Sequence, residues 1–270
     1  MRGMMKGALA LGVGAAALWV PASANNSWGG YHWARTANPV TVQLGDNVDS
    51  RWDSYLRTTQ ADWNTSTVIE SPLVPGSTKP RNCRGVAGTI QVCNASYGST
   101  GWLGIASISI TGGTHNTQGT VKLNDTYFNT AQYNTPAWRN MVSCQEVGHT
   151  YGLDHQDENF SNTNLGTCMD YTNDPTGAAG TNGSLNNEHP NAHDYDQLNT
   201  IYGHLDSTTT VAFRANAAGS FGEPGDTPRE WGRAIHRDGR GRPDMFERVD
   251  GPGAKTITHV FWALETPRMR

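Results

Sequence analysis

Apolar and polar residues alternate over several short stretches, and each of these stretches predicts a β-strand. Residues 39–48 (PVTVQLGDNV), 66–74 and 102–110 (WLGIASISI) show β-branched or apolar alternation between turn residues. A shorter strand is predicted at 119–125, at an edge of the sheet, because Lys122 and the polar residues near it suit exposure. The first half of the chain is therefore expected to build a sheet.

Apolar residues at helical spacing predict three helices, at 49–64, 136–151 and 192–204. The middle helix is expected to begin at Pro136, and Gly152 is suited to end it. Between the last two helices, residues 154–190 are rich in Asn, Asp, Thr and Gly. Such a long polar segment predicts a loop that either is disordered or holds a site.

The composition changes beyond Asp206, where half of the chain's Lys and Arg residues lie. Within this tail, Gly-Pro-Gly at 251–253 separates two strand-like stretches, 245–249 and 256–262, which predicts a hairpin. We therefore predict a main domain at 25–206 and a C-terminal extension of unknown role at 207–270.

The N-terminus has the pattern of a secretory signal. Arg2 and Lys6 precede an apolar stretch at 8–20, and the small residues 22–24 (Ala-Ser-Ala) follow it. An apolar run this short predicts a cleaved signal at 1–24 rather than a membrane span, which needs about 20 residues. We expect a secreted, extracellular protein with no membrane span.

The net charge bears on the kind of partner, and the cysteine content bears on the disulfides of the chain. The formal net charge of −4 argues against a nucleic-acid partner, because phosphate binding needs a concentrated positive surface. Four cysteines in an exported chain predict two disulfides, although sequence alone leaves three pairings open. Proximity favours Cys83 with Cys93, which leaves Cys144 with Cys168.

One run of residues carries candidate chemistry, Gln145-Glu-Val-Gly-His149-Thr-Tyr-Gly152-Leu-Asp-His155, at the end of the middle helix. Residues 145 and 149 share a helix face, so both side chains can reach one ion. Glu146 is one step around the helix, where a carboxylate can address a metal-bound water. Gly152 allows the chain to turn so that His155 returns as a third ligand, and three ligands plus water form a catalytic zinc site.

This run resembles the metzincin motif H-E-x-x-H-x-x-G-x-x-H at every defined position except the first, where Gln145 stands. Thr167-Cys-Met169-Asp-Tyr171 resembles the Met-turn of that family. The resemblance covers residues 38–205. It implies an α+β fold, with a twisted mixed sheet, an active-site helix, a Met-turn and a C-terminal helix.

The resemblance also implies a function, that of a monomeric zinc metalloendopeptidase. Zinc would be held by Gln145, His149 and His155, with Met169 beneath it. Glu146 would be the general base, and Tyr171 would help to stabilise the oxyanion. The partner would be an extended peptide or protein substrate, pairing with the strand at 119–125. In this reading a Cys144–Cys168 disulfide ties the active-site helix to the Met-turn.

The amide at position 145 leaves two interpretations open. Gln145 is either an unusual working ligand or a lost ligand in an exported pseudo-protease that binds peptides or surfaces without cutting them. Retained Glu146 and Tyr171 favour the enzyme, and the amide at 145 favours the pseudo-protease.

The sequence contains two further groups of residues of types that can bind metal ions. The acids of the polar loop predict either a structural calcium site or a solvated loop, and they are Asp154, Asp157, Glu158, Asp170 and Asp174. The other histidines lack ligand spacing and are expected to be structural or exposed, namely His32, His115, His189, His193, His204, His236 and His259.

Overall fold

Eleven strands and five helices form the part of the chain that the computed structural model describes, residues 26–180, 183–211 and 225–264. The predicted signal at 1–24 lies outside these residues. The helices are α1 (Asp53–Trp63), α2 (Asp125–Phe128), α3 (Pro136–Thr150), α4 (Ala192–Ile201) and α5 (Pro228–Trp231). The strands are β1 (His32–Trp33), β2 (Val40–Thr41), β3 (Gln43–Asn47), β4 (Ile69–Glu70), β5 (Leu73–Pro75), β6 (Thr89–Ala95), β7 (Trp102–Thr111), β8 (His115–Asn124), β9 (Arg233–Arg237), β10 (Pro243–Gly251) and β11 (Ala254–Trp262).

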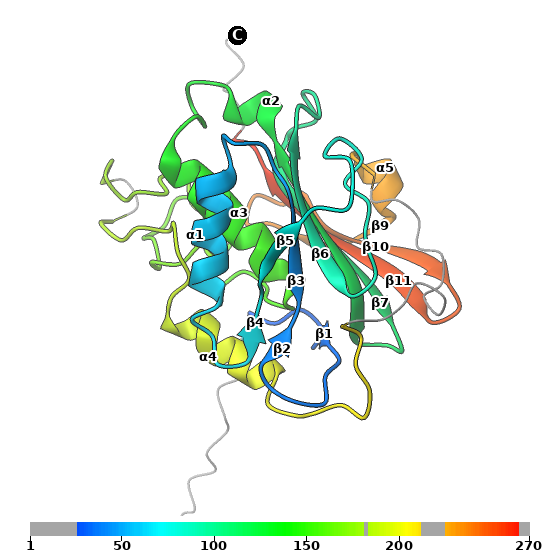
Figure 1. Ribbon diagram of the computed structural model, residues 1–270. Helices are drawn as coiled ribbons and strands as arrows, with labels where there is room; N and C mark the ends of the chain where they lie inside the picture. The colour runs from blue at the N-terminus through cyan, green and yellow to red at the C-terminus, as the bar shows by residue number, and fades with distance from the viewer. Residues whose placement is uncertain (1–25, 181–182, 212–224, 265–270) are drawn as a thin grey trace, which may run out of the picture.

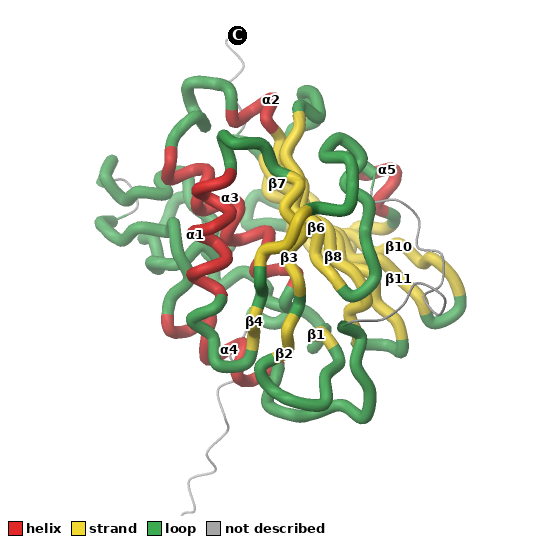
Figure 2. The backbone as a smooth tube through the Cα atoms, viewed as in Figure 1, coloured by secondary structure: helices red, strands yellow, loops and turns green. Residues whose placement is uncertain are grey.

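A mixed nine-stranded sheet organises the fold, in the order β5-β3-β6-β8-β7-β11-β10-β9, with β1 paired to β8 (Figure 1). Strands β5, β3, β6 and β8 run parallel, whereas β7, β11, β10 and β9 join by antiparallel pairing. The helices α1 and α3 lie on one face of this sheet (Figure 2). The chain therefore has the expected α+β class.

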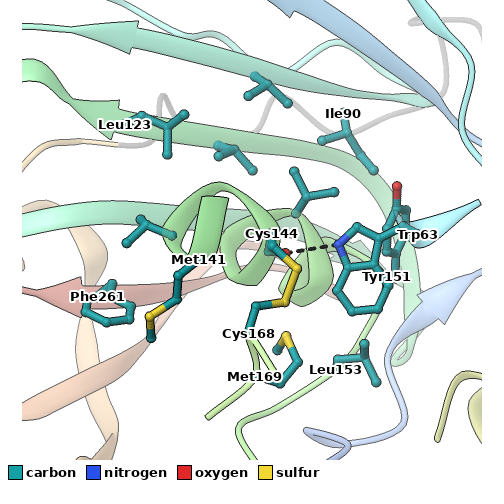
Figure 3. Packing of buried hydrophobic residues seen from close by; sticks show 14 of the residues in the cluster. Trp63, Ile90, Leu123, Met141, Cys144, Tyr151, Leu153, Cys168, Met169 and Phe261 are labelled. Atoms are coloured by element: carbon teal, nitrogen blue, oxygen red, sulfur yellow. Dashed lines mark hydrogen bonds between the residues drawn. A yellow bond between two sulfur atoms is a disulfide. The ribbon is translucent and has the colours of Figure 1, made fainter. Parts of the chain in front are cut away.

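The main core lies between the sheet and the helices α1 and α3. Thr135 caps α3 by accepting a hydrogen bond from the backbone N–H of Trp138, and Pro136 occupies the first helical position. Trp63 of α1 is fully buried, and its ring N–H donates to the carbonyl of Cys144 at 3.0 Å (Figure 3). This packing fixes α3 over the sheet.

The disulfides are those that proximity favours, Cys83–Cys93 and Cys144–Cys168. Figure 3 shows the second bridge beside α3, next to Met169. No helix within the described ranges is both long and apolar enough to cross a bilayer.

Most predicted elements are present, with shifted bounds. The stretch 39–48 divides into β2 and β3, the stretch 66–74 into β4 and β5, and the three predicted helices correspond to α1, α3 and α4. The hairpin of the tail is β10 and β11. Strand β6 and the two-residue β1 were not predicted.

The expected edge position of the strand at 119–125 is wrong. Strand β8 is interior, hydrogen-bonded to β6 on one side and to β7 on the other. Lys122 suggested exposure, yet it is 3% exposed, because its ammonium group pairs with the Asp226 carboxylate at 2.7 Å. A substrate cannot pair with a strand whose two edges are occupied.

The C-terminal strands continue the main sheet. Strand β11 pairs with β7 from Ala254 opposite Thr111 to Trp262 opposite Trp102. The predicted extension therefore contributes to the face of the sheet that α3 covers, and α3 contacts β11 directly.

Candidate metal and catalytic site

Helix α3 carries three of the predicted site residues in its last turns, Gln145, Glu146 and His149. The chain leaves the helix at Gly152, whose φ of +101° suits glycine. A side chain there would also meet the carbonyl oxygen of Tyr31 at 2.0 Å. Glycine thus permits the reversal that brings His155 back toward the helix.

The side chains of His149 and His155 lie next to each other. Their ring centroids are 4.7 Å apart, with the planes nearly perpendicular at 85°. The Nδ1–H of His149 donates to the carbonyl of Leu153 at 2.8 Å, which leaves Nε2 with its lone pair in the neutral ring. Both side chains are buried.

A third histidine joins this pair from the C-terminal extension. His259 of β11 stacks on His149, with ring centroids 4.0 Å apart and planes 13° from parallel. One ring nitrogen from each of His149, His155 and His259 lies within 4.8 Å of the others. Sequence spacing gave no signal for His259, which is 104 residues beyond His155. The predicted hairpin includes the strand that carries His259, but the sequence does not indicate that this strand pairs with β7.

The chemistry of these rings suits a metal ion. Both ring nitrogens of His155 and both of His259 are buried without a hydrogen-bond partner. Buried polar atoms are normally satisfied, so orphaned nitrogens that lie within 4.8 Å of one another fit the lone-pair donors of a cation site. Three imidazoles are a ligand set that zinc commonly takes.

Burial and neighbouring carboxylates set the charge of the rings. Burial lowers the pKa of His149 and of His259 well below the usual value, so both are neutral at neutral pH. Burial also disfavours the charged form of His155, but Glu158 and Asp154, each 3.7 Å from Nδ1, outweigh it and raise the pKa. These carboxylates can orient the ring of His155.

Gln145 lies at the turn of residues 167–171, the segment that resembles a Met-turn. Its amide nitrogen donates to the carbonyl of Cys168 at 2.7 Å, while its oxygen is buried without a hydrogen-bond partner. Met169 packs under α3 at Gly148, where an added Cβ would lie 2.7 Å from the methionine sulfur. The amide thus connects the helix to the turn, and its oxygen stays available as a ligand.

Glu146 is fully buried against strands β7 and β11. Gly104 makes room for it, since a Cβ there would lie 2.5 Å from the Glu146 carboxylate oxygen. Burial raises the pKa of Glu146 well above its ordinary value. The backbone N–H groups of Phe261 and Ala106 oppose this shift, but neither reaches hydrogen-bonding geometry. Burial therefore favours the neutral form of this carboxyl group.

Tyr171 lies beside His155, with ring centroids 4.1 Å apart. Its hydroxyl lies 3.4 Å from the Asp244 carboxylate of β10 and 3.5 Å from the Val260 carbonyl, and its single proton is shared between these two acceptors. Phe160 stacks on the other face of the Tyr171 ring at 4.6 Å. The C-terminal strands and the polar loop therefore both contact this tyrosine.

The acids of the polar loop largely serve its own backbone. Asp170 accepts from the Leu165 N–H and the Asn187 amide, and Asp174 accepts from Thr176 and Ala179. Burial raises the pKa of Asp170 to about 6, and one of its oxygens is buried without a partner. Calcium binding by this loop stays a prediction.

A cleft adjoins the buried site on the side of Phe160. It has a volume of about 700 Å³, and Ser161, Arg240, Arg242 and Trp262 are among its lining residues. The guanidinium of Arg240 lies over the Phe160 ring at 3.6 Å. Phe160 and Arg240 thus stand between this cleft and Tyr171.

Comparison with known proteins adds no relative, since no model of a protein family matches the chain and no curated protein is significantly similar to it.

Proposed function

We propose that this chain is an exported zinc-dependent endopeptidase, with His149, His155 and His259 as metal ligands and Glu146 as general base. The observation that carries the proposal is the gathering of three buried imidazoles, one of them on the helix that also carries the buried carboxyl group of Glu146. Three nitrogen ligands with one open position are typical of catalytic zinc. The resemblance of residues 145–155 to the metzincin motif supports the same chemistry.

In this proposal the C-terminal extension supplies the imidazole that the motif lacks at Gln145. His259 would complete the ligand set, while Gln145 holds the Met-turn through the Cys168 carbonyl. This assignment explains how the motif can retain its other positions after losing its first histidine.

The residues around the ligands suit peptide hydrolysis. Bound zinc would lower the pKa of a water and polarise the carbonyl of the scissile peptide bond. Glu146 would accept a proton from the attacking water and pass it to the leaving amine. The hydroxyl of Tyr171, placed beside His155, would donate to the oxyanion that develops.

Substrate access requires a movement, because the side chains of the site are buried. Strand β11 is hydrogen-bonded along β7, whereas Phe160 belongs to a loop without regular structure, so the loop is the easier of the two to displace. Displacing Phe160 would open Tyr171 to the cleft lined by Arg240. If water admitted there reached Glu146, its burial would lessen and its pKa would fall, which favours the carboxylate that a general base requires.

The burial of the site also favours a second candidate function, a metal-binding protein that does not cleave peptides. Closed sites with all positions protected are typical of structural rather than catalytic zinc. Under this alternative Glu146 stays buried and neutral.

Digestion of casein or a quenched fluorescent peptide by the purified full chain tests the two candidates. We expect cleavage that a chelator abolishes, that Glu146→Gln reduces at least about 100-fold, and that the exposed control Glu70→Gln retains. Metal content should be equal in all three proteins. Bound metal without cleavage would favour the second candidate, and neither metal nor cleavage would reject both.

A further inference from the structure

Three further histidines lie around the carboxylate of Asp206, a residue that follows α4 in the chain. His32 of β1, His115 at the start of β8, and His204 after α4 each direct Nε2 toward the same oxygen, Oδ1 of Asp206. The three separations are 3.4, 3.3 and 3.6 Å, respectively. None of these residues belongs to the site around His149.

The fold itself brings these side chains together. Strand β1 pairs with β8 in a register that places His32 beside His115, with ring centroids 5.1 Å apart. The chain after α4 then brings His204 to His32, where the two Nε2 atoms are 3.2 Å apart. Three segments distant in sequence thus converge on one carboxylate oxygen.

The hydrogen bond that His32 donates leaves two acceptor atoms facing each other, one on His32 and one on Asp206. The Nδ1–H of His32 donates to the carbonyl of Gly30 at 2.8 Å, so the Nε2 of the neutral ring carries a lone pair. That lone pair faces Asp206 Oδ1, which is also an acceptor. Two facing acceptors repel unless a proton or a cation lies between them.

Asp206 is held in place by a buried arginine. The other carboxylate oxygen, Oδ2, accepts from the backbone N–H and from a guanidinium N–H of Arg35, each at 3.0 Å. Arg35 also donates to the carbonyl of His204, and it is 2% exposed. Partners of this kind orient the ligands of a metal site and leave one oxygen of the carboxylate free.

Four of the six ligand–ligand distances fit a four-coordinate zinc site. Zinc bonds to nitrogen or oxygen are about 2.0 Å long, so neighbouring ligand atoms of a tetrahedral site are about 3.3 Å apart. The four separations given above run from 3.2 to 3.6 Å. His32, His115 and Asp206 each offer a ligand atom within 4.8 Å of the other two, and His204, whose side chain is 54% exposed, approaches Asp206 and His32 from the solvent side.

We propose that His32, His115, His204 and Asp206 form a second, structural zinc site. Four protein ligands leave no position for a substrate, so the metal would join the N-terminal segment to β8 and to the end of α4. Because His115 and His204 are partly exposed, an ion can reach the site from solvent.

Metal analysis of the purified full chain after dialysis tests this site. Wild type should bind about two zinc equivalents, and His115→Ala should bind about one. His193→Ala, an exposed histidine outside both groups, should match wild type. His155→Ala should also lose one equivalent, and its double variant with His115→Ala should lose both.

Thermal unfolding separates loss of metal from simple destabilisation. Adding zinc to metal-free wild type should raise Tm in two saturable steps, and His115→Ala should lack one of them. The conservative variant Asp206→Asn should weaken the same step. Equal metal content and equal zinc response in His115→Ala, His193→Ala and wild type would overturn the proposal. Failure of the peptidase assay alone would leave this site unaffected.

Discussion

At the scale of single residues, the amide of Gln145 and the imidazole of His259 differ in the role that each can take in the candidate site. Gln145 stands at the first ligand position of the motif but donates its amide N–H to the carbonyl of Cys168, whereas His259, both of whose ring nitrogens are unpaired, has one of them within 4.8 Å of His149 and His155. Imidazole is also the better zinc donor, because its nitrogen is more basic than an amide oxygen. We therefore assign the third ligand to His259.

This assignment predicts unequal effects of two substitutions. His259→Ala should weaken zinc binding by at least about 100-fold, the upper range for residues that only orient a ligand. Gln145→Ala should leave most of the affinity, since it removes a bond to the Met-turn rather than a ligand. Competition with a calibrated zinc chelator measures both. Tight binding by His259→Ala with loss in Gln145→Ala would return the ligand role to the glutamine.

The sequence could identify His149 and His155 because the helix period and the turn at Gly152 are local properties of the chain. His259 could not be identified in this way, since its place depends on which strand β11 pairs with. The same holds for His32, His115 and His204, which are joined by the pairing of β1 with β8 and by the exit of α4. Ligands that come from separate elements leave no spacing in the sequence.

At the scale of elements, local pattern predicted α3 and β7 well but misjudged β8. Helix periodicity and strand alternation report which residues are apolar, and the N-cap Thr135 and the glycine that follows the C-cap, Gly152, mark where α3 begins and ends. Exposure of a strand, by contrast, depends on its neighbours. Lys122 is buried because Asp226 arrives from the C-terminal segment to neutralise it, which no local pattern indicates.

The Cys144–Cys168 disulfide links α3 to the Met-turn, and its loss should affect both stability and the site. Replacing both cysteines with alanine should lower the free energy of unfolding by about 2–5 kcal/mol. The matched control lacks Cys83 and Cys93, whose separation is 10 residues rather than 24, so it should lose about 0.8 kcal/mol less. Urea unfolding measures the two costs.

The two double variants should differ more clearly in metal binding. Only loss of the Cys144–Cys168 bridge frees the turn that carries the Gln145 contact and Met169. Zinc affinity should therefore fall in that variant and stay unchanged in the control. Equal zinc affinity in both variants would show that the bridge supports the fold without shaping the site.

At the scale of the whole molecule, the question is whether the C-terminal strands stay in place in the proposed enzyme. Strand β11 continues the sheet at β7, packs under α3 and carries His259. If His259 is a ligand during turnover, β11 must remain in place while the polar loop opens. If β11 instead has to leave, His259 would hold the metal only in a closed form.

A disulfide between β7 and β11 distinguishes these cases. Ser107 and Thr258 are cross-strand partners whose hydroxyls are 2.9 Å apart, so cysteines there can bridge the strands. Thr258 points to the sheet face opposite His259, because side chains alternate along a strand. The bridge should therefore leave the ligands undisturbed.

We expect the bridged Ser107→Cys/Thr258→Cys protein to keep the zinc content and peptidase activity of the two single variants, within about twofold, because β11 has no need to move. Its Tm should rise, since the bridge closes a long loop of the unfolded chain. Activity that disappears in the bridged protein but persists in both single variants would mean that β11 must separate from β7 before a peptide can be cut. The imidazole of His259 would then be a ligand that the enzyme releases in order to work.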